Sequence, residues 1–290
     1  MSSVSIISLG NVARWGRAVK REPAQISGKR CELTGFILSG LEKKGAVRYN
    51  IKWFKRETEE GMFPGFNNDL LSFYADIRFN NDKSFMDAHR KEYYQKVRDP
   101  FYAFIDELAP TMLAIDEEME VRPHKCLSRI NRDTRFTKDK SPYRDHHWVA
   151  FRQAARDKDG APFYWFEIRL DEVSWGLGVW GENQALFDAL RRRILARPDE
   201  VMFALRTAYE HGYQVGGQVW KKNLQPPPTV PEMLKSLYPA RSLYFEKTGI
   251  DPAWIFDGGI VERVASDFKA LTPVWKLLRG LNDIEGENNV

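Results

Sequence analysis

The strongest pattern in the chain is the segment Phe163-Tyr-Trp-Phe-Glu-Ile-Arg-Leu-Asp-Glu-Val-Ser-Trp-Gly-Leu-Gly-Val-Trp180. Apolar residues recur in it at every second position, and aromatic and β-branched types are frequent, which is typical of β-strands. We expect Asp171-Glu172 to form a two-residue turn, so that Leu170 pairs with Val173 in an antiparallel hairpin. An antiparallel sheet built around this hairpin is therefore the expected centre of the fold.

The two faces of the expected hairpin differ in character. One face carries only apolar side chains and should pack against helices, whereas the other should pair Arg169 with Ser174, Glu167 with Gly176 and Trp165 with Gly178. Because glycine has no side chain, we expect open space on that second face for a loop or a ligand. Glu167 and Arg169 would line this space.

Helices are expected before and after the hairpin in the sequence. Asn67 has the position of an N-cap, Asp82 caps a second helix, and Asp99-Pro100 restarts the helix with proline in its first turn. Further elements are expected as strands at residues 147–152 and 241–247, helices at 183–196 and 199–211, and a terminal helix carrying Ile260, Val264, Phe268 and Leu271 that is capped again at Thr272-Pro273. We therefore predict an α+β fold, with a largely antiparallel central sheet covered by N-terminal and C-terminal helices.

The first 61 residues differ from the rest of the chain. They carry 12 Lys/Arg and 6 Asp/Glu and show no sustained hydrophobic period, whereas residues 62–290 carry 32 Lys/Arg and 34 Asp/Glu. We expect residues 1–61 to be a basic extension that is either disordered or not part of the native protein, whose start would then be Met62. Residues 62–281 are expected to form a single α+β domain, and residues 282–290 a polar tail.

Composition excludes several classes of protein. Hydrophobic residues make up 43% of the chain, enough for a packed core, but no run of about 18 apolar residues could span a membrane. The N-terminus lacks the apolar core of a secretory signal. With only two cysteines, Cys31 and Cys126, the chain fits a reducing compartment better than a disulfide scaffold, so we expect a cytoplasmic protein.

Residues 122–144, here called the basic segment, concentrate positive charge. They contain eight Lys/Arg and two Asp, a local net charge of +6 in a chain whose total is +4. A planar guanidinium group binds phosphate or carboxylate through two parallel hydrogen bonds, so arginines at every third position indicate an anion-binding surface. The residues expected to bind an anionic small molecule are Ser128, Arg129, Arg132, Arg135, Lys138, Lys140 and Tyr143, together with Arg169 of the hairpin.

Three interpretations of the basic segment stay open. It could bind an anionic or phosphate-bearing small molecule, or it could bind nucleic acid together with the basic residues 1–61. Alternatively, its arginines could pair with carboxylates and form an ion-pair clasp that holds the sheet to the helices. If the site also performs chemistry, Asp133 or Glu167 is the candidate acid or base. The sequence establishes neither a reaction nor an oligomeric state.

Two further motifs argue against a cofactor or a metal. The glycines of Gly176-Leu-Gly-Val-Trp-Gly181 have the G-x-G-x-x-G spacing of a dinucleotide site, but that site requires a parallel βαβ unit, and an antiparallel hairpin is expected here. His146 and His147 are adjacent on an expected strand, so they point to opposite faces and cannot readily bind one ion. We therefore expect no cofactor and no metal.

Several motifs, in this order, resemble the domain-of-unknown-function 2461 family of bacteria and fungi. They are Phe63-Pro-Gly-Phe66, Asn80-Asn81, Phe85-Met-Asp-Ala-His-Arg90, the run from Ser128 to Arg144, and Gly176-Leu-Gly-Val-Trp180. The resemblance covers about residues 62–281 and implies a domain start near Met62. It departs from the family at Asp82-Lys-Ser-Phe-Met86, where members often have Asn-Arg-Glu-Trp-Phe. The resemblance implies no activity.

Overall fold

The computed structural model describes residues 62–154, 160–181, 183–220 and 224–283. All of these residues belong to one unit of the chain. The expected extension, residues 1–61, and residues 284–290 of the expected tail lie outside the described residues, so the domain boundaries stay predictions. No helix in the described part is both long and apolar enough to cross a membrane.

Five antiparallel strands form the sheet within the described residues, in the order β1-β2-β3-β5-β4. They are β1 (His147–Phe151), β2 (Phe163–Ile168), β3 (Val173–Val179), β4 (Gln214–Gly216) and β5 (Leu243–Ile250). Helices precede and follow the strands, so the predicted α+β fold with an antiparallel sheet is confirmed. Since β3 pairs with antiparallel neighbours on both sides, the parallel unit that a dinucleotide motif requires is missing at Gly176.

The register of the central hairpin differs from the prediction by two residues. Val173 pairs with Ile168, not with Leu170, and a four-residue connection replaces the expected two-residue turn. This connection is closed by the backbone N–H of Arg169, which donates to the carbonyl of Glu172 at 2.9 Å. Because side chains alternate with a period of two, a shift of two residues leaves every side chain on its predicted face.

The space predicted beside the glycines is filled by aromatic rings, so that expectation was wrong. Trp165, not Glu167, lies opposite Gly176, and a Cβ on Gly176 would come within 2.6 Å of the Trp165 ring. A Cβ on Gly178 would likewise come within 2.6 Å of Tyr244 on β5. Gly176 therefore makes room for the Trp165 ring and Gly178 for the main chain and Cβ of Tyr244, not for a loop or a ligand.

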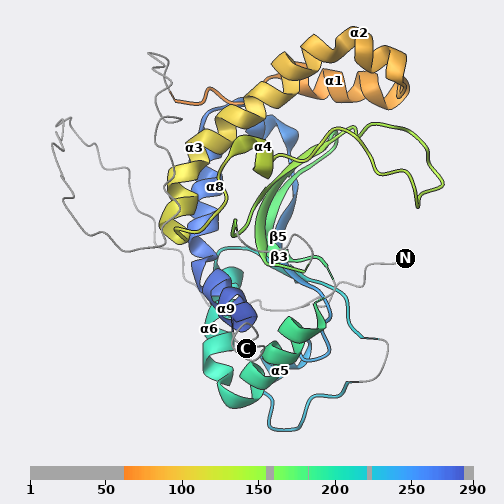
Figure 1. The fold of residues 1–290 in the computed structure, drawn as a ribbon. Coiled ribbons are helices and arrows are strands. Elements are labelled where there is room, and N and C mark those ends of the chain that lie inside the picture. The colour runs from red at the N-terminus through yellow and green to blue at the C-terminus, as the bar shows by residue number, and fades with distance from the viewer. Residues whose placement is uncertain (1–61, 155–159, 182, 221–223, 284–290) are drawn as a thin grey trace, which may run out of the picture. The chain divides into compact units, whose positions relative to one another are not determined.

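One face of the sheet, here called the inner face, packs against helices. Figure 1 shows α3 and α8 along this side of the sheet. The Phe166 ring lies 4.5 Å from the ring of Phe104 on α3, and Tyr164 lies 4.9 Å from Phe268 on α8. Those side chains are all buried, so this face carries the hydrophobic core. The opposite face, here called the outer face, carries the side chains of Trp148 on β1, Glu167 on β2 and Ser174 on β3.

The helix that precedes the sheet continues without a break at Asp99-Pro100, where the sequence predicted that a new helix begins. Asn67 and Asp82 are N-caps as predicted, accepting from the backbone N–H groups of Asp69 and Phe85. At Pro100, however, the chain continues through a π-helical turn in which the Asp99 N–H donates to the Tyr94 carbonyl. Proline has no N–H to give to the preceding turn, and a wider turn accommodates it. The elements involved are α1 (Asn68–Phe79), α2 (Lys83–Tyr93), η2 (Tyr94–Arg98) and α3 (Asp99–Ile115).

The remaining helices agree with the predictions where they are long. These are α5 (Gln184–Ala196), α6 (Pro198–Glu210), α8 (Gly259–Ala270) and α9 (Thr272–Asp283). The elements that sequence reasoning missed are α4 (Pro123–Cys126), β4, α7 (Glu232–Lys235) and the 3₁₀ helix η3 (Pro252–Phe256). Each of these is too short for a hydrophobic period to show in the sequence.

Candidate functional site

Most of the basic segment folds into a hairpin-like loop, residues 130–144, here called the basic hairpin. The Arg132 N–H donates to the Pro142 carbonyl, and the Arg144 N–H donates to the Ile130 carbonyl, both at 2.8 Å. In Figure 1 this is the yellow-green loop that extends away from the sheet. Its two ends therefore lie together beside β1, while its apex, residues 133–141, projects away from them.

Two side chains at the end of α1 hold the basic hairpin to the helices. The Asn81 amide pairs with the backbone of Tyr143 in both directions, donating at 3.0 Å and accepting at 2.9 Å. The Arg78 Nε donates to the Asp145 carboxylate at 2.6 Å. Tyr143 itself is buried in the core, so its side chain does not join the charged residues with which it was predicted to act.

The charged side chains at the apex of the hairpin are either engaged within the hairpin or exposed. Arg135 donates from Nε and Nη2 to the two carboxylate oxygens of Asp133, at 2.9 and 2.7 Å. These hydrogen bonds lower the pKa of Asp133 to about 2, which makes it a poor general base at neutral pH. The Lys140 ammonium donates to the Thr134 carbonyl at 2.8 Å, and Lys138 is exposed. The apex is therefore a locally paired, solvated loop.

At the base of the hairpin, three arginines gather: Arg129, Arg132 and Arg144, here called the arginine cluster. Arg144 is half-buried, with its guanidinium carbon 4.8 Å from the centre of the Trp148 ring. Burial, together with the charges of Arg132 and Arg129, lowers the pKa of Arg144. Arg132 pairs with Asp139, whereas within the described residues no carboxylate pairs with Arg129 or Arg144. Positive charge thus exceeds negative charge at this point.

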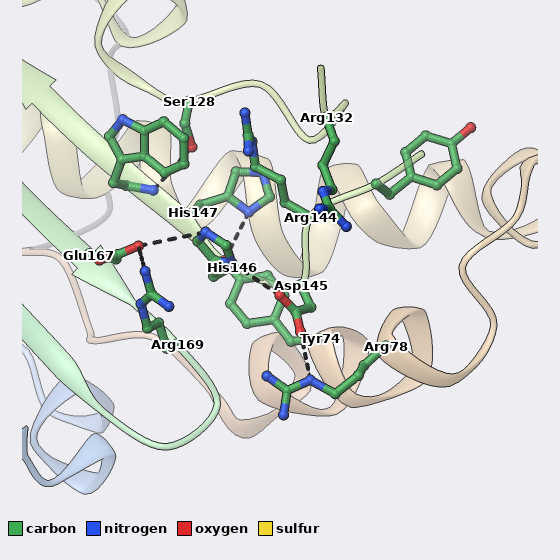
Figure 2. Close-up of polar contacts among 12 residues, drawn as sticks. Tyr74, Arg78, Ser128, Arg132, Arg144, Asp145, His146, His147, Glu167 and Arg169 are labelled. Atoms are coloured by element: carbon green, nitrogen blue, oxygen red, sulfur yellow. Dashed lines mark hydrogen bonds and ion pairs between the residues drawn. The ribbon is translucent and has the colours of Figure 1, made fainter. Parts of the chain in front are cut away.

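A histidine held between two carboxylates lies next to the cluster. The Nδ1 of His146 is 3.0 Å from the Asp145 carboxylate, and its Nε2 is 3.7 Å from the Glu167 carboxylate (Figure 2). Burial by itself would raise the pKa of Asp145, but hydrogen bonds from His146 and Arg78 outweigh it, and the pKa is lowered. Glu167 in turn pairs with Arg169 at 3.0 Å. Each group in this chain of contacts is therefore positioned by its neighbours.

His147 occupies the opposite environment. Its ring is fully buried, and Nδ1 and Nε2 lie 3.0 and 3.2 Å from the hydroxyl groups of Tyr74 and Tyr93. Burial lowers the pKa of His147 to about 3, so the ring is neutral and links β1 to α1 and α2. The two histidines thus point to opposite faces as predicted. Within the described residues, no group of His, Cys, Asp and Glu is arranged to hold a metal ion.

The predicted site residues are divided by the structure into three groups. Ser128, Arg129 and Arg132 lie at the base of the hairpin, and His146 connects that region to Glu167 on β2, which pairs with Arg169 in the connection after that strand. The predicted residues at the apex are Asp133, Arg135, Lys138 and Lys140, and Tyr143 is buried. Ser128 accepts at its hydroxyl from the Trp148 N–H at 3.0 Å, which anchors it beside the cluster.

Sequence reasoning did not include Arg144 among the residues expected to bind an anion, and it did not identify Asn81 as the anchor of the hairpin. A signal for Arg144 was available, because Arg144, His146 and Trp148 recur with a period of two before a predicted strand and so share its outer face. No such signal exists for Asn81, which could be recognised only as part of a helix end. Its partner Tyr143 is 62 residues away in the sequence.

A family model described as conserved hypothetical protein (DUF2461) matches residues 69–276. No curated protein matches the chain. Since the matched region covers most of the chain, the protein belongs to the DUF2461 family, as the order of its motifs indicated. That description names no activity, so the function has to be argued from the site itself.

Proposed function

We propose that the protein binds a phosphate-bearing small molecule at the arginine cluster. The observation that carries this proposal is Arg144, a half-buried guanidinium beside two other arginines, with no carboxylate partner within the described residues. Holding like charges together, partly out of water, costs free energy. A bound anion would offset this cost, and the excess of positive charge would attract it.

The chemistry of the cluster favours phosphate over a single carboxylate. Guanidinium groups present paired N–H donors that match two phosphate oxygens, and three cations suit a ligand with more than one negative charge. The guanidinium group of Arg144 lies against the Trp148 ring, and this contact limits the rotation of the arginine side chain. The Ser128 hydroxyl accepts from a backbone N–H, so its own hydrogen is still available to a ligand.

The contacts of the basic hairpin support binding over the ion-pair clasp. Its ion pairs, Arg132 with Asp139 and Arg135 with Asp133, stay within the hairpin and do not reach the helices. Exposed pairs of this kind contribute little to stability. The attachment to the helices is made by Asn81 and by one ion pair, between Arg78 and Asp145, which involves none of the arginines of the cluster. Arg129 and Arg144 therefore have no carboxylate partner within the described residues with which a bound anion would have to compete.

Glu167 and His146 are the residues placed to exchange a proton with a ligand held there. Both lie beside the cluster, and His146 contacts a carboxylate on each side. Asp133, the other candidate acid or base, is engaged by Arg135 at the apex. If the protein catalyses a reaction on its ligand, Glu167 is therefore the better candidate of the two.

The proposal is tested by titrating the full chain with sodium pyrophosphate in a calorimeter. Arg144→Gln should weaken binding by about 10- to 100-fold, the loss expected for hydrogen bonds between charged groups. Arg129→Gln, at an exposed position, should also weaken it and controls for effects on folding. Arg192→Gln removes the same charge from an exposed position on α5 and should leave the affinity unchanged. Equal affinity in all four proteins would contradict the proposal.

A further inference from the structure

The two most exposed of the large apolar side chains in the described residues are both phenylalanines. Phe136, at the apex of the basic hairpin, keeps 90% of its surface exposed, and Phe79, the last residue of α1, keeps 85%. A single exposed apolar residue is common on protein surfaces. Neither of these rings packs into the core, however, and one of them lies on a loop that extends away from the sheet. Their surface is therefore available to a partner outside the chain.

The two rings belong to elements that contact each other. Arg78, next to Phe79 in the sequence, pairs with Asp145 directly after the basic hairpin, and Asn81 pairs with the Tyr143 backbone. Figure 1 shows the turn between α1 and α2 and the basic hairpin extending toward the same side of the molecule. This side therefore presents two exposed rings on two separate projecting segments.

Short-range hydrogen bonds build the apex and engage both of its carboxylates. Asp139 accepts from the N–H and the hydroxyl of Ser141, at 2.9 and 2.7 Å. Asp133 accepts from the backbone N–H of Arg135 at 3.2 Å and from its guanidinium group. The guanidinium carbon of Arg135 lies 5.4 Å from the centre of the Phe136 ring. The polar groups of the apex thus fold the loop on itself and leave the phenylalanine on the outside.

Positive charge accompanies the ring at the apex. Lys138 and Lys140 are exposed, and in the part of the chain that the structure describes neither pairs with a carboxylate, although Lys140 donates to the Thr134 carbonyl. The basic hairpin, residues 130–144, contains five Lys/Arg and two Asp, a net charge of +3. An ammonium group is a point charge without a preferred plane, so it suits a surface that carries many anionic groups. The apex therefore combines an apolar ring with charge that attracts anions.

We infer that the apex of the basic hairpin docks on an anionic lipid membrane, with Phe136 inserted among the headgroups and Lys138 and Lys140 held by the charge of the lipids. A bilayer surface accepts an apolar side chain of any outline and requires no complementary pocket. Negatively charged lipids attract nearby lysines, and such docking needs no membrane-spanning helix. Phe79 supplies a second apolar contact from the same side. This inference goes beyond the proposed function, because the apex is not part of the arginine cluster.

The arrangement favours a membrane over a nucleic acid. A bound single strand follows a charged groove along which successive bases stack on aromatic rings. Phe79 and Phe136 instead project separately from two segments, which suits contact with a plane. The guanidinium group of Arg135, which could otherwise bind a phosphate through two hydrogen bonds, is engaged by Asp133, so lysines carry the unpaired charge beside the ring.

The test is flotation of the full chain with phosphatidylcholine vesicles, with and without about 30% phosphatidylserine, at increasing lipid concentration. The unaltered protein should bind the vesicles with phosphatidylserine about 10-fold more tightly, since both lysines gain from the negative surface. Phe136→Ser should weaken this binding by about 10- to 100-fold, the loss expected when a phenylalanine ring stays in water. Phe79→Ser should weaken it too. Phe136→Trp keeps a ring suited to the membrane interface and should retain the binding.

Matched variants separate the apex from the rest of the surface. Phe203→Ser removes another exposed ring, at 63%, from α6, which lies away from the basic hairpin in Figure 1, and should bind like the unaltered protein. Changing Lys138 and Lys140 together to glutamine should weaken binding to phosphatidylserine vesicles by about 10-fold. The same change at Arg192 of α5 and Lys276 of α9, both exposed, removes equal charge elsewhere and should leave the binding unchanged.

Several outcomes would overturn the inference. Vesicle binding that is unchanged in Phe136→Ser, or that is equally tight without phosphatidylserine, would exclude docking through the apex. An oligomer that Phe136→Ser dissociates, measured by sedimentation without lipid, would make the ring a contact between copies of the chain. A single-stranded oligonucleotide that binds more tightly than the vesicles, and loses its binding in Phe136→Ser, would make nucleic acid the partner.

Pyrophosphate separates failure of this inference from failure of the proposed function. Phe136→Ser should leave the affinity for sodium pyrophosphate unchanged, because the arginine cluster lies at the base of the hairpin. Binding of pyrophosphate without binding of vesicles would overturn the inference alone. Binding of vesicles through Phe136 without binding of pyrophosphate would support the inference and overturn the proposed function.

Discussion

The two faces of the sheet differ most sharply at His146 and His147, which are adjacent in the sequence. On the inner face, His147 is fully buried between two tyrosine hydroxyl groups. On the outer face, His146 is half-buried among charged groups, next to arginines without carboxylate partners within the described residues. The contrast teaches that the inner face is fully used in holding the fold together. The outer face carries polar and aromatic groups whose arrangement the core does not need.

The largest expected effect comes from breaking the inner face. Phe166→Ala should lower the free energy of unfolding by about 3–5 kcal/mol, because the fully buried ring packs against Phe66, Phe104 and Trp175 and would leave a cavity. Trp180→Ala on the outer face should lower it by only about 1 kcal/mol, since about half of that ring is already exposed to water. Urea denaturation measures both. Similar losses in the two variants would contradict the division between the faces.

A smaller effect is expected from acid. The pKa of His147 is about 3 in the folded protein and about 6.5 in an unfolded chain, so between these values the unfolded state binds the extra proton. Its contribution to stability is therefore complete above pH 6.5 and is lost as the pH falls towards 3. From pH 7.5 to 5 the loss should be about 2 kcal/mol.

Two matched variants assign that loss to one histidine. Urea denaturation of His147→Gln at pH 7.5 and 5 should show a smaller pH dependence than the unaltered protein, because glutamine does not titrate. His146→Gln should keep the full dependence on pH attributed to His147. If His146→Gln flattened the pH dependence and His147→Gln did not, the assignment of the buried neutral histidine would be incorrect.

The smallest effect concerns how the basic hairpin is attached. Asn81→Ala removes both hydrogen bonds to the Tyr143 backbone and should lower the free energy of unfolding by about 1–2 kcal/mol. Arg132→Gln should have a smaller effect, because its partner Asp139 is exposed and lies in the same hairpin. Thermal unfolding of both variants makes the comparison. A larger loss of stability for Arg132→Gln than for Asn81→Ala would support the interpretation of the basic segment as an ion-pair clasp.

Much of the fold could be predicted because it depends on neighbouring residues. The N-caps Asn67 and Asp82 were predicted correctly, since each cap accepts a hydrogen bond from a backbone N–H two or three residues further on. The faces of β2 and β3 were also correct, because side chains alternate. The predicted pairing of Val173 with Leu170 was wrong, since the register depends on the length of a turn that the alternation does not specify.

The candidate site could be predicted only in part. Positive charge in residues 122–144 indicated an anion site, and Ser128, Arg129 and Arg132 do lie together at the base of the hairpin. The sequence could not separate them from Arg135 at the apex, because charge density is the same along the segment. Which arginines lack a carboxylate partner depends on where the hairpin bends.

By itself, the sequence determined the α+β class, the N-caps Asn67 and Asp82, the two faces of the central strands and the concentration of positive charge. Only the tertiary structure decided that Arg144 joins Arg129 and Arg132, that Asn81 holds the hairpin, and that Trp180 lies on Tyr244. The physical reason is distance along the chain. N-caps and the alternation of side chains follow from a few neighbouring residues. These contacts, in contrast, join residues far apart in the sequence, and they form only when the folding of the core brings those residues together.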